Sequence, residues 1–578
     1  MEATFHIGIV GLGSKGLFGF ERLLANLKSI KFASIEIHLF NATNLFATGW
    51  IYDPKQPDYL KMNYPNIYIS LEPPKEPPAL IKILSFSQWQ ANKYKTSAEE
   101  VDYAIASRKE VGAYFHHYFT KLCASSPKNI KIHKHLAKVL SIQNIDEKYS
   151  VQTDRKNWKS PCFSSLLITT GHSPSISSKL QKPYPKQDNI PFIYPVNEKL
   201  NFILPNASIA CKGMGLTAID AILALTEGRG GEFDSKNKQE WKYEKSGKEP
   251  LKIYPFSISG IPIVPRNPHP SGPQKSYLFK RYINSFDSQL KVFDFEKELL
   301  PVIKQDMVGE YYFQVFKNYG KNLYLDQPFE EVKEEIHEFH NLYPLEKEFK
   351  ATDLLYPKFN PKKLNSELLE YWKMWLEELE RKDSPLVAAA GTWKNLSGDF
   401  NTLYSNNRLT ANSKAKFTKT YFSLFNRVSY GPPIQNIKKM LALADRDILE
   451  FTLAKNPNVE EVNGKNYLTL NHNRVSFDVL LDARIPRGYD KNSEVLFTEK
   501  KSETIFRFHT SMLNFNFADT LMIDKNGNPL DEKGIPNLNI CLYGTPTEGV
   551  LFDNDTLSRK RNDTASLWAQ KVSELIKK

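Results

Sequence analysis

The sequence predicts an α/β fold in which two Rossmann-like dinucleotide-binding domains accompany a mostly helical insertion. Two glycine-rich turns, at residues 11–16 and 213–218, support this prediction. Each turn follows a short apolar run and precedes a segment with helical periodicity. A third observation is the long region of helical patterns that separates the second turn from strand-like runs near the C-terminus.

The first glycine turn lies within a predicted βαβ unit. Residues 7–10 are Ile-Gly-Ile-Val, which suits a buried parallel strand, and residues 11–16 give G-x-G-x-x-G. Helical spacing follows, and a second strand is expected over residues 35–40. In such a unit the glycines allow a tight turn, close approach of a pyrophosphate, and close helix–strand packing. We take Gly11, Gly13, Ser14 and Gly16 as candidate cofactor-binding residues; the alternative is a glycine-rich turn in an ordinary α/β protein.

The second strand ends in Asn41, where an acidic residue usually binds the ribose hydroxyls. Asparagine can also hydrogen-bond a hydroxyl, but it lacks the charge-assisted strength of a carboxylate. Asn41 is therefore a candidate ribose ligand with a weaker bond than usual.

Composition excludes several classes of protein. The 578 residues are enough for two to four domains, and no apolar run is long enough to cross a membrane. The four cysteines lie far apart, so neither a disulfide framework nor a metal site is predicted, and a reducing, cytoplasmic compartment is expected. The N-terminal stretch carries the glycine motif and charged residues, which disfavours a signal peptide.

The net charge of +12 is also compatible with nucleic-acid binding. The lysines are spread along the chain, however, and no basic run with interleaved aromatic residues occurs. We therefore expect no nucleic-acid partner and interpret the excess charge as an attraction for anionic ligands such as dinucleotides.

The second glycine turn resembles the first. Residues 208–211 form a predicted strand, Gly213 and Gly215 follow it, and Thr217 begins a helical pattern. Ala218 occupies the third glycine position, where a small residue still permits close packing. Arg229, just beyond this helix, is a candidate clamp for a phosphate or carboxylate; the alternative is a solvated cation at a helix end.

The remaining chain contains three further informative segments. An apolar run over 166–168 ends in Thr-Thr-Gly171-His172, as expected where the first nucleotide-binding domain passes into the second. Residues 365–382 predict a helix whose N-cap is Asn365 or Ser366. Strands are expected over 479–484 and 539–544, followed by a helix over 565–576. Two dinucleotide sites in one chain suggest an enzyme in which a nicotinamide reduces a flavin.

These motifs resemble a bacterial FAD/NAD(P)-binding protein family related to flavin-dependent N-monooxygenases, including nitrosuccinate-forming enzymes. The resemblance runs from residue 8 to about residue 568 and rests on several segments in one order. Besides the two glycine turns these are Glu-Arg-Leu (21–23), Leu-Lys-Met-Asn (60–63), Arg108 with Gly112 and Tyr114, Thr-Gly-His (170–172), Leu-Thr-Glu-Gly-Arg-Gly-Gly-Glu-Phe (225–233), Tyr-Gly-Pro-Pro (430–433), Asp-Ala-Arg (482–484) and Gly-Thr-Pro-Thr-Glu-Gly (544–549).

The resemblance implies a FAD site built from the first glycine turn and the C-terminal segment, with NAD(P)H bound between the sites. It adds Met62, Gly171, Gly544, Thr547, Glu548 and Gly549 to the candidate cofactor-binding residues. Glu548 is the nearest candidate for the acid that holds the ribityl chain, in place of the usual Asp. Asn63 is the candidate catalytic polar group near the flavin; the alternative is an Asn that caps a loop.

We expect four regions: the N-terminal part of a FAD-binding domain (1–195), an NAD(P)-binding region (196–300), a mostly helical inserted or substrate domain (301–470), and a C-terminal part that completes the FAD domain (471–578). The predicted function is that of a flavin-dependent oxidoreductase, more narrowly an NADPH- or NADH-dependent monooxygenase that uses molecular oxygen on an amine or amino-acid-like small molecule. The alternatives are a flavin reductase or dehydrogenase without oxygenation, and a nucleotide-bound scaffold or sensor without catalysis.

Overall fold

A computed structural model describes residues 4–31, 33–145, 147–172, 189–237, 239–267, 278–485, 522–531, 533–554 and 556–577. The chain divides into two compact units. Unit 1 comprises Met1–Leu60, Tyr64–Lys182 and Ile485–Lys578, and unit 2 comprises Lys61–Asn63 and Pro183–Arg484. Each unit is described separately.

Unit 1 is built on a seven-stranded sheet with the order β3-β2-β1-β6-β5-β4, and β16 pairs with β6 outside this path. The pairs among β3, β2, β1, β6 and β16 are parallel, whereas β4 and β5 are antiparallel to their neighbours. The strands are β1 (Phe5–Val10), β2 (Ile35–Asn41), β3 (Ile130–Leu136), β4 (Val139–Ile145), β5 (Lys148–Thr153), β6 (Phe163–Ile168) and β16 (Ile540–Leu542). A strand from the end of the chain therefore joins the sheet that begins at the N-terminus.

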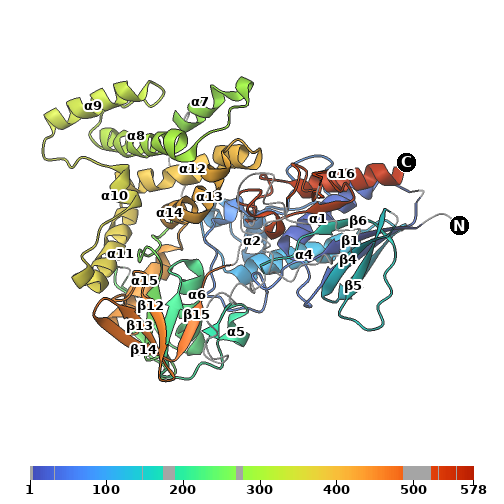
Figure 1. Cartoon of the computed structure of the whole chain (residues 1–578), viewed down its shortest axis with the longest axis horizontal. Coiled ribbons are helices and arrows are strands. Elements are labelled where there is room, and N and C mark those ends of the chain that lie inside the picture. The colour runs from blue at the N-terminus through green and yellow to red at the C-terminus, as the bar shows by residue number, and fades with distance from the viewer. Residues whose placement is uncertain are drawn as a thin grey trace. The chain divides into compact units, whose positions relative to one another are not determined.

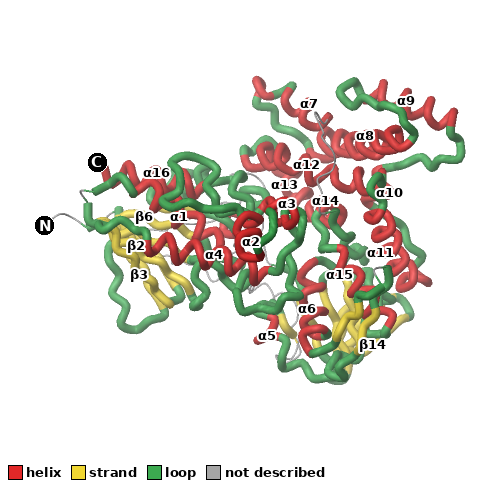
Figure 2. The backbone as a smooth tube through the Cα atoms, turned by 180° about the vertical axis from the view of Figure 1, so that it is seen from behind, coloured by secondary structure: helices red, strands yellow, loops and turns green. Residues whose placement is uncertain are grey.

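Helices pack on this sheet and on one another. They are α1 (Ser14–Leu27), α2 (Phe86–Tyr94), α3 (Ala98–Val101), α4 (Arg108–Ala124) and α16 (Thr564–Lys577). Helix α1 contacts β1, β6, α4 and α16, and Figures 1 and 2 show α1 and α16 side by side. Helix α1 has an apolar face whose residues are fully buried, namely Leu17, Phe20, Leu23 and Leu24, so burial of this face holds the helix in place.

A buried carboxylate shared by two arginines also fixes the position of α1. Arg22 donates to Glu21 from Nε at 2.8 Å and from Nη2 at 2.5 Å, and Arg559 Nη2 donates to the same carboxylate at 2.9 Å. Arg22 Nη1 also donates to the carbonyl oxygens of Lys75 and Pro77, at 2.9 and 2.8 Å. Because Glu21 and Arg22 are inaccessible to solvent, removal of one partner would leave an uncompensated buried charge.

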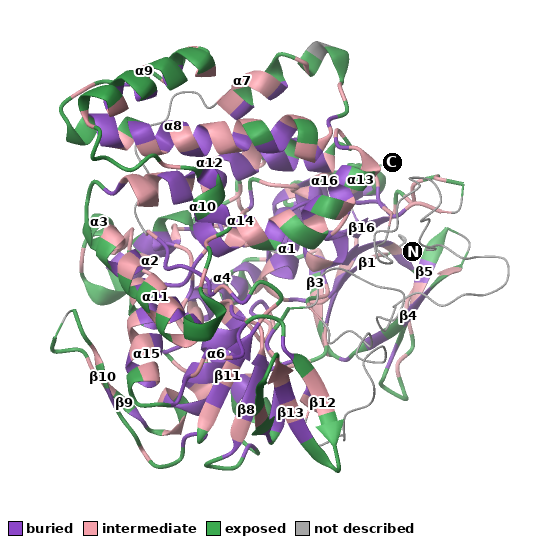
Figure 3. Cartoon of the chain, turned by 60° about the vertical axis from the view of Figure 1, so that its left-hand side comes forward, coloured by how far each residue is buried: buried purple, intermediate pink, exposed green. Residues whose placement is uncertain are grey.

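Unit 2 contains a parallel four-stranded sheet with the order β11-β8-β15-β7. Its strands are β7 (Asn189–Ile190), β8 (Ser208–Lys212), β11 (Lys252–Phe256) and β15 (Val479–Asp482). Strands β9 (Glu232–Asp234) and β10 (Lys242–Glu244) form a hairpin, and β12 (Asn458–Val462), β13 (Lys465–Leu470) and β14 (Asn473–Phe477) form an antiparallel sheet. Helix α6 (Leu216–Leu225) follows β8, and Figure 3 shows α6 and β11 mostly in the colour of buried residues.

Helices form the rest of unit 2. They are α5 (Val196–Lys199), α7 (Leu278–Asn284), α8 (Leu300–Asn318), α9 (Phe329–Leu342), α10 (Ala351–Leu355), α11 (Leu364–Glu380), α12 (Pro385–Ser405), α13 (Ala411–Lys416), α14 (Phe422–Ser429) and α15 (Ile434–Asp445). Helices α8 and α12 pack against each other, as Figure 3 shows. A core rich in aromatic rings forms where Trp393 and Phe400 of α12 meet Phe417 and Phe425.

Three local features of the structure differ from what the sequence predicts. The helical region ends at Asp445, and residues 458–477 form strands β12–β14. Strand β15 pairs with β8, so residues 471–484 lie in unit 2 and not in the segment expected to complete the first domain. Helix α11 begins at Leu364 because a 3-10 turn over Pro361–Lys363, capped by Asn360, leads into it. Asn365 Oδ1 instead accepts from the N–H of Phe451 at 2.8 Å.

Within the described residues, no helix has both the length and the apolar character that a membrane span requires.

Candidate functional site

The first glycine turn joins β1 to α1 at the carboxyl end of the parallel strands. Gly11 has a φ of +88°, and its N–H donates to the carbonyl of Phe40 at 2.9 Å. A Cβ at Gly11 would lie 2.8 Å from the backbone nitrogen of Thr170, and one at Gly16 would lie 2.4 Å from the carbonyl oxygen of Gly11. Both positions therefore need glycine, for backbone conformation and for close packing.

Gly13 and Ser14 form the start of α1 and leave open space beside the backbone. Gly13 is the N-cap residue, and a Cβ there would have no heavy atom within 4 Å. No side chain caps the helix, and its first turn holds no acidic residue. The N–H groups at this helix start are thus available to an anion, and the open space at Gly13 fits the close approach of a pyrophosphate.

Asn41 lies at the end of β2, as predicted, but its side-chain amide hydrogen-bonds to the backbone of neighbouring loop residues. Its Oδ1 accepts from the N–H of Leu12 at 3.1 Å, and its Nδ2 donates to the carbonyl of Thr43 at 2.9 Å. An aspartate could make only the first of these bonds. This pair of bonds gives a physical reason for asparagine at this position, independent of any contact with ribose.

The second glycine turn has the same construction in unit 2. Gly213 has a φ of +136°, and a Cβ there would lie 2.7 Å from the carbonyl oxygen of Ala483. Gly215 is the N-cap of α6, with no heavy atom within 4 Å of a Cβ and no acidic residue in the first turn of the helix. Thr217 is buried within that first turn. This helix start is thus open to an anion in the same way as that of α1.

Arg229 is occupied by backbone carbonyl groups. Its Nη1 donates to Lys248 at 2.9 Å, and its Nη2 donates to Ile203 at 2.7 Å and to Leu200 at 3.2 Å. The guanidinium therefore holds three loop carbonyls together. These bonds support neither of the two interpretations from the sequence, an anion clamp or a solvated helix-end cation.

The C-terminal candidates lie just after β16. Gly544 and Gly549 have φ values of +79° and +95°, and a Cβ at Gly544 would lie 2.8 Å from Cγ of Lys15. Thr547 is fully buried and donates to the carbonyl of Gly544 at 2.8 Å. The side chain of Glu548 is also buried and accepts from the N–H of Asn554 at 2.5 Å, so part of this carboxylate stabilises the loop. Gly171 follows β6, and a Cβ there would meet no atom within 4 Å.

The segment 61–63 belongs to unit 2, where Asn63 contacts residues that are distant in sequence. Met62 is buried, and Asn63 Nδ2 donates to the carbonyl of Tyr430 at 3.1 Å. Asn63 Oδ1 accepts no hydrogen bond from any described residue. Arg266 Nη1 donates to the backbone oxygen of Asn63 at 2.6 Å, and its guanidinium carbon lies 5.5 Å from the ring centroid of Tyr430. Asn63, Arg266 and Tyr430 therefore form one cluster.

A pocket in unit 2 adjoins this cluster. Its described lining residues are Pro265, Arg266, Asn267, Trp375, Leu379, Val387, Ala390, Gly391, Lys394, Val428 and Ser429. The lining holds two cations, Arg266 and Lys394, and no described carboxylate. Trp375 Nε1 is buried and donates to no described residue. Burial, with the charge of Arg266 as a second cause, lowers the pKa of Lys394 to about 8. The charged groups of this lining are of the kind that binds an anionic group.

Sequence reasoning missed Arg266 and Lys394. Neither residue belongs to a motif, and residues 266 and 394 come together only through the packing of α11 and α12 beside the 263–267 segment. The one available signal was Tyr430, because Tyr-Gly-Pro-Pro is among the segments of the resemblance and its first residue contacts both Asn63 and Arg266.

Three comparisons bear on this geometry. The profile of a family described as FAD-NAD(P)-binding matches residues 8–173. A nitrosuccinic acid synthase of Aspergillus oryzae is 23% identical over 595 residues, which cover 94% of this chain and 88% of that protein. An L-aspartate N-monooxygenase (nitrosuccinate-forming) of Streptomyces davaonensis is 21% identical over 359 residues, 56% of this chain and 54% of that protein.

The fold resembles that of a solved ornithine hydroxylase structure. The reduced form of ornithine hydroxylase from Pseudomonas aeruginosa superposes with a TM-score of 0.50 and 11% identity, over 99% of each chain. The comparisons confirm the predicted resemblance to flavin-dependent N-monooxygenases, the α/β fold with FAD/NAD(P)-binding domains, and the cofactors FAD and NAD(P). They also confirm the predicted class of enzyme, a flavin-dependent oxidoreductase.

Proposed function

We propose that this protein is an N-monooxygenase that hydroxylates the amino group of a small carboxylate-bearing molecule, in the first instance an amino acid. The observation that carries the substrate class is the pocket beside Arg266 and Lys394, which offers two cations and the N–H of Trp375 and no described carboxylate. A carboxylate binds best to such charge-assisted donors. The names of two relatives, an L-aspartate N-monooxygenase and a nitrosuccinic acid synthase, support the same class.

The two glycine turns are the proposed cofactor sites. In unit 1 the N–H groups at the start of α1 would bind the pyrophosphate of FAD, with Gly11, Gly13, Ser14 and Gly16 shaping the turn. In unit 2 the start of α6, with Gly213, Gly215 and Thr217, would bind the pyrophosphate of NAD(P)H. Asn41, Gly171 and the 544–549 segment complete the proposed FAD site. Arg229 is left out because its guanidinium donates to three carbonyls.

Asn63 is the proposed polar group at the reacting amine. Its Nδ2 is held by the carbonyl of Tyr430 and its backbone oxygen by Arg266, so the side chain has a defined orientation. Its Oδ1 remains available to accept an N–H of the substrate amine. The flavin, when bound, supplies the activation of oxygen, and the protein binds and orients the amine.

The proposed reaction balances with one nicotinamide per hydroxylation. The amine, O₂, NAD(P)H and one proton give the hydroxylamine, NAD(P)⁺ and water. One oxygen atom forms the new N–O bond, the other leaves as water, and the hydride of NAD(P)H supplies the electron pair.

The test begins with the absorption spectrum of the purified full-length protein and its anaerobic titration with NADPH and NADH. A flavin band that bleaches supports both cofactor sites, whereas a protein that takes up no FAD would favour the scaffold alternative. Aerobic turnover is then measured with L-aspartate, L-ornithine and L-lysine, and with L-alaninamide as a matched amine without a carboxylate. Hydroxylamine formed from an amino acid but not from L-alaninamide supports the proposal. Equal NADPH oxidation with and without every amine, with peroxide as the only product, would favour the reductase alternative.

A further inference from the structure

Four histidines and one glutamate gather on one face of the unit 1 sheet, away from the glycine turn. His6 lies on β1, Glu36 and His38 on β2, and His133 and His135 on β3. The parallel register pairs His6 with Glu36 and His38 with His133, so these side chains project to the same face. His6 and Glu36 lie near the amino ends of their strands. Gly11 is five residues along the chain from His6, about 16 Å in an extended strand.

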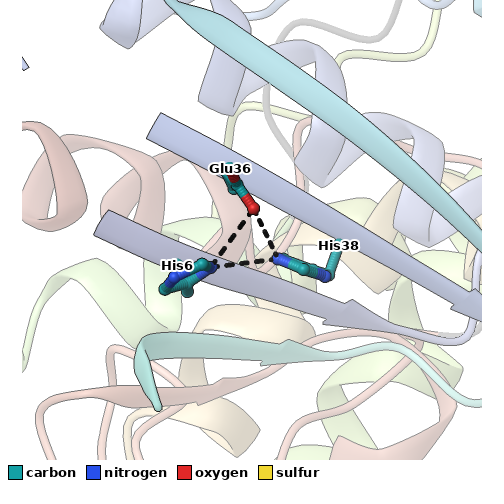
Figure 4. A group of neighbouring side chains, drawn as sticks. All are labelled: His6, Glu36 and His38. Carbon is teal, nitrogen blue, oxygen red and sulfur yellow. Dashed lines mark hydrogen bonds and ion pairs between the residues drawn. The ribbon is translucent and has the colours of Figure 1, made fainter. Parts of the chain in front are cut away.

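Three of these side chains converge on one point, as Figure 4 shows. His6 Nδ1 lies 3.2 Å from His38 Nε2, and Glu36 Oε2 lies 3.7 Å from His6 Nδ1 and 3.8 Å from His38 Nε2. The point equidistant from three atoms with these separations lies about 2.1 Å from each, which matches the bond lengths of Zn²⁺ to imidazole nitrogen and to carboxylate oxygen.

We propose that His6, Glu36 and His38 bind a divalent transition-metal ion of the Zn²⁺ type. Two imidazoles and one carboxylate are a usual ligand set for such ions and leave one or more positions for water or another ligand. The fourth position has a candidate in His133, whose Nε2 is buried, forms no hydrogen bond to a described residue and lies 3.1 Å from Glu36 Oε2. The site is independent of the proposed oxygenation.

The surroundings of the three ligands also suit a metal ion. His38 Nδ1 lies 3.0 Å from His135 Nε2 and can donate to it, which is the second interaction that metal-bound histidines usually make. The other oxygen of Glu36, Oε1, lies 3.9 Å from Lys131 Nζ, which leaves Oε2 to the ion. His38 is buried, while the side chains of His6 and Glu36 remain about one-fifth exposed, so an ion can enter from solvent.

Burial lowers the pKa of both His38 and His6. Burial, followed by the charges of His133, His135 and His6, lowers the pKa of His38 to about 3. Burial also lowers the pKa of His6, where Glu36 acts in the opposite direction and Lys148 in the same direction. A neutral imidazole has the free lone pair that a metal requires. Because the ligands come from neighbouring strands, a bound ion would cross-link β1 and β2.

The test uses full-length, FAD-loaded protein that is stripped with a chelator and then titrated calorimetrically with ZnCl₂. A parallel titration with Co²⁺ follows the visible bands that a tetrahedral nitrogen–oxygen site produces. We expect one ion per chain. His6→Gln, Glu36→Gln and His38→Gln should each weaken binding at least about tenfold, while His337→Gln, an exposed histidine on α9, should leave it unchanged.

Each variant is first compared with the wild type in FAD content and in thermal unfolding without metal. His6→Gln keeps the test decisive if the variant at the more buried His38 does not fold. Absence of stoichiometric binding to the wild-type protein would overturn the proposal. Binding that all three ligand variants retain with wild-type affinity would overturn it as well.

Discussion

Arg266 Nη1 donates to the backbone oxygen of Asn63 over 2.6 Å, although 203 positions separate the two residues. Arg266 also lines the cationic pocket, and Asn63 is the proposed polar group at the reacting amine. One guanidinium thus lines the proposed substrate pocket and holds the backbone of Asn63, which carries the proposed catalytic amide. Substitution of Arg266 should therefore change substrate binding and the position of Asn63 together.

Arg266→Gln should raise the KM for the amino acid substrate by about ten- to hundredfold, because a charge-assisted hydrogen bond contributes about 1.5–3 kcal/mol. Steady-state kinetics with hydroxylamine detection measures this change. Arg266→Lys should recover part of the affinity, and Arg381→Gln, an exposed arginine paired with Glu378, is the matched control. A KM that stays within twofold of the wild type in Arg266→Gln would remove Arg266 from the substrate site.

Lys394 should make amino acid binding depend on pH. Its pKa is lowered to about 8, so the ammonium that attracts a carboxylate is present below this pH and is lost above it. The value of kcat/KM, which reports on the free enzyme, should therefore fall as the pH rises through about 8. Lys394→Gln should give a lower profile without this step, and Lys394→Arg should move the step to higher pH. An unchanged step in Lys394→Gln would assign it to another group.

Substitution of Gly13 and of Gly215 should distinguish the proposed FAD site from the proposed NAD(P)H site. A Cβ at either residue meets no protein atom within 4 Å, so alanine should leave the fold intact and occupy space proposed for a pyrophosphate. Gly13→Ala should lower the FAD content of the purified protein, measured by absorbance. Gly215→Ala should retain FAD but raise the KM for NAD(P)H several-fold. Equal effects of the two substitutions on both cofactors would contradict the assignment of one site to each turn.

Because of Asp306, the free energy of unfolding should decrease as the pH rises from about 4 to about 7. The N–H groups of Leu278 and Phe279 donate to its carboxyl group at 2.8 and 2.9 Å, but burial dominates and raises its pKa to about 7. In this pH range the folded protein retains a proton that the unfolded chain has lost. The free energy of unfolding therefore decreases with rising pH, by up to about 1.4 kcal/mol per unit.

Urea unfolding of Asp306→Asn across the same pH range measures this contribution. The substitution should flatten the slope, whereas Asp326→Asn, at an exposed position, should keep it. A wild-type stability that rises from pH 4 to pH 7 and is unaffected by Asp306→Asn would show that the carboxyl group ionises normally.

The glycine turns were predictable because their chemistry is local. A Cβ at Gly11, Gly16 or Gly213 would clash with neighbouring backbone atoms, so each position needs glycine. This requirement appears in the sequence as a short glycine motif. Asn41 was only partly predictable. Its place at the end of β2 follows from the βαβ pattern, but its bonds to Leu12 and Thr43 depend on the path of the loop after the strand.

The pocket and the histidine cluster depend on contacts between distant segments. Arg266 and Lys394 meet through the packing of a helical region whose sequence shows which faces are apolar but not which helices adjoin. Glu36 and His38 lie two residues apart on β2, whereas His6 lies on β1 and His133 on β3. Their shared face follows only from the strand order β3-β2-β1, which the sequence analysis did not derive. For this reason a search for close metal-ligand spacing did not find them.

The most direct test of the proposed function is turnover under ¹⁸O₂ with NADPH and L-aspartate, with mass spectrometry of the N-oxygenated product and a parallel assay for peroxide. L-Ornithine and L-lysine are tested in the same way. The account predicts one ¹⁸O atom on the substrate nitrogen for each hydroxylation and one NADPH consumed with it. NADPH oxidation that yields only labelled peroxide with every amino acid, from a protein that binds FAD, would contradict it.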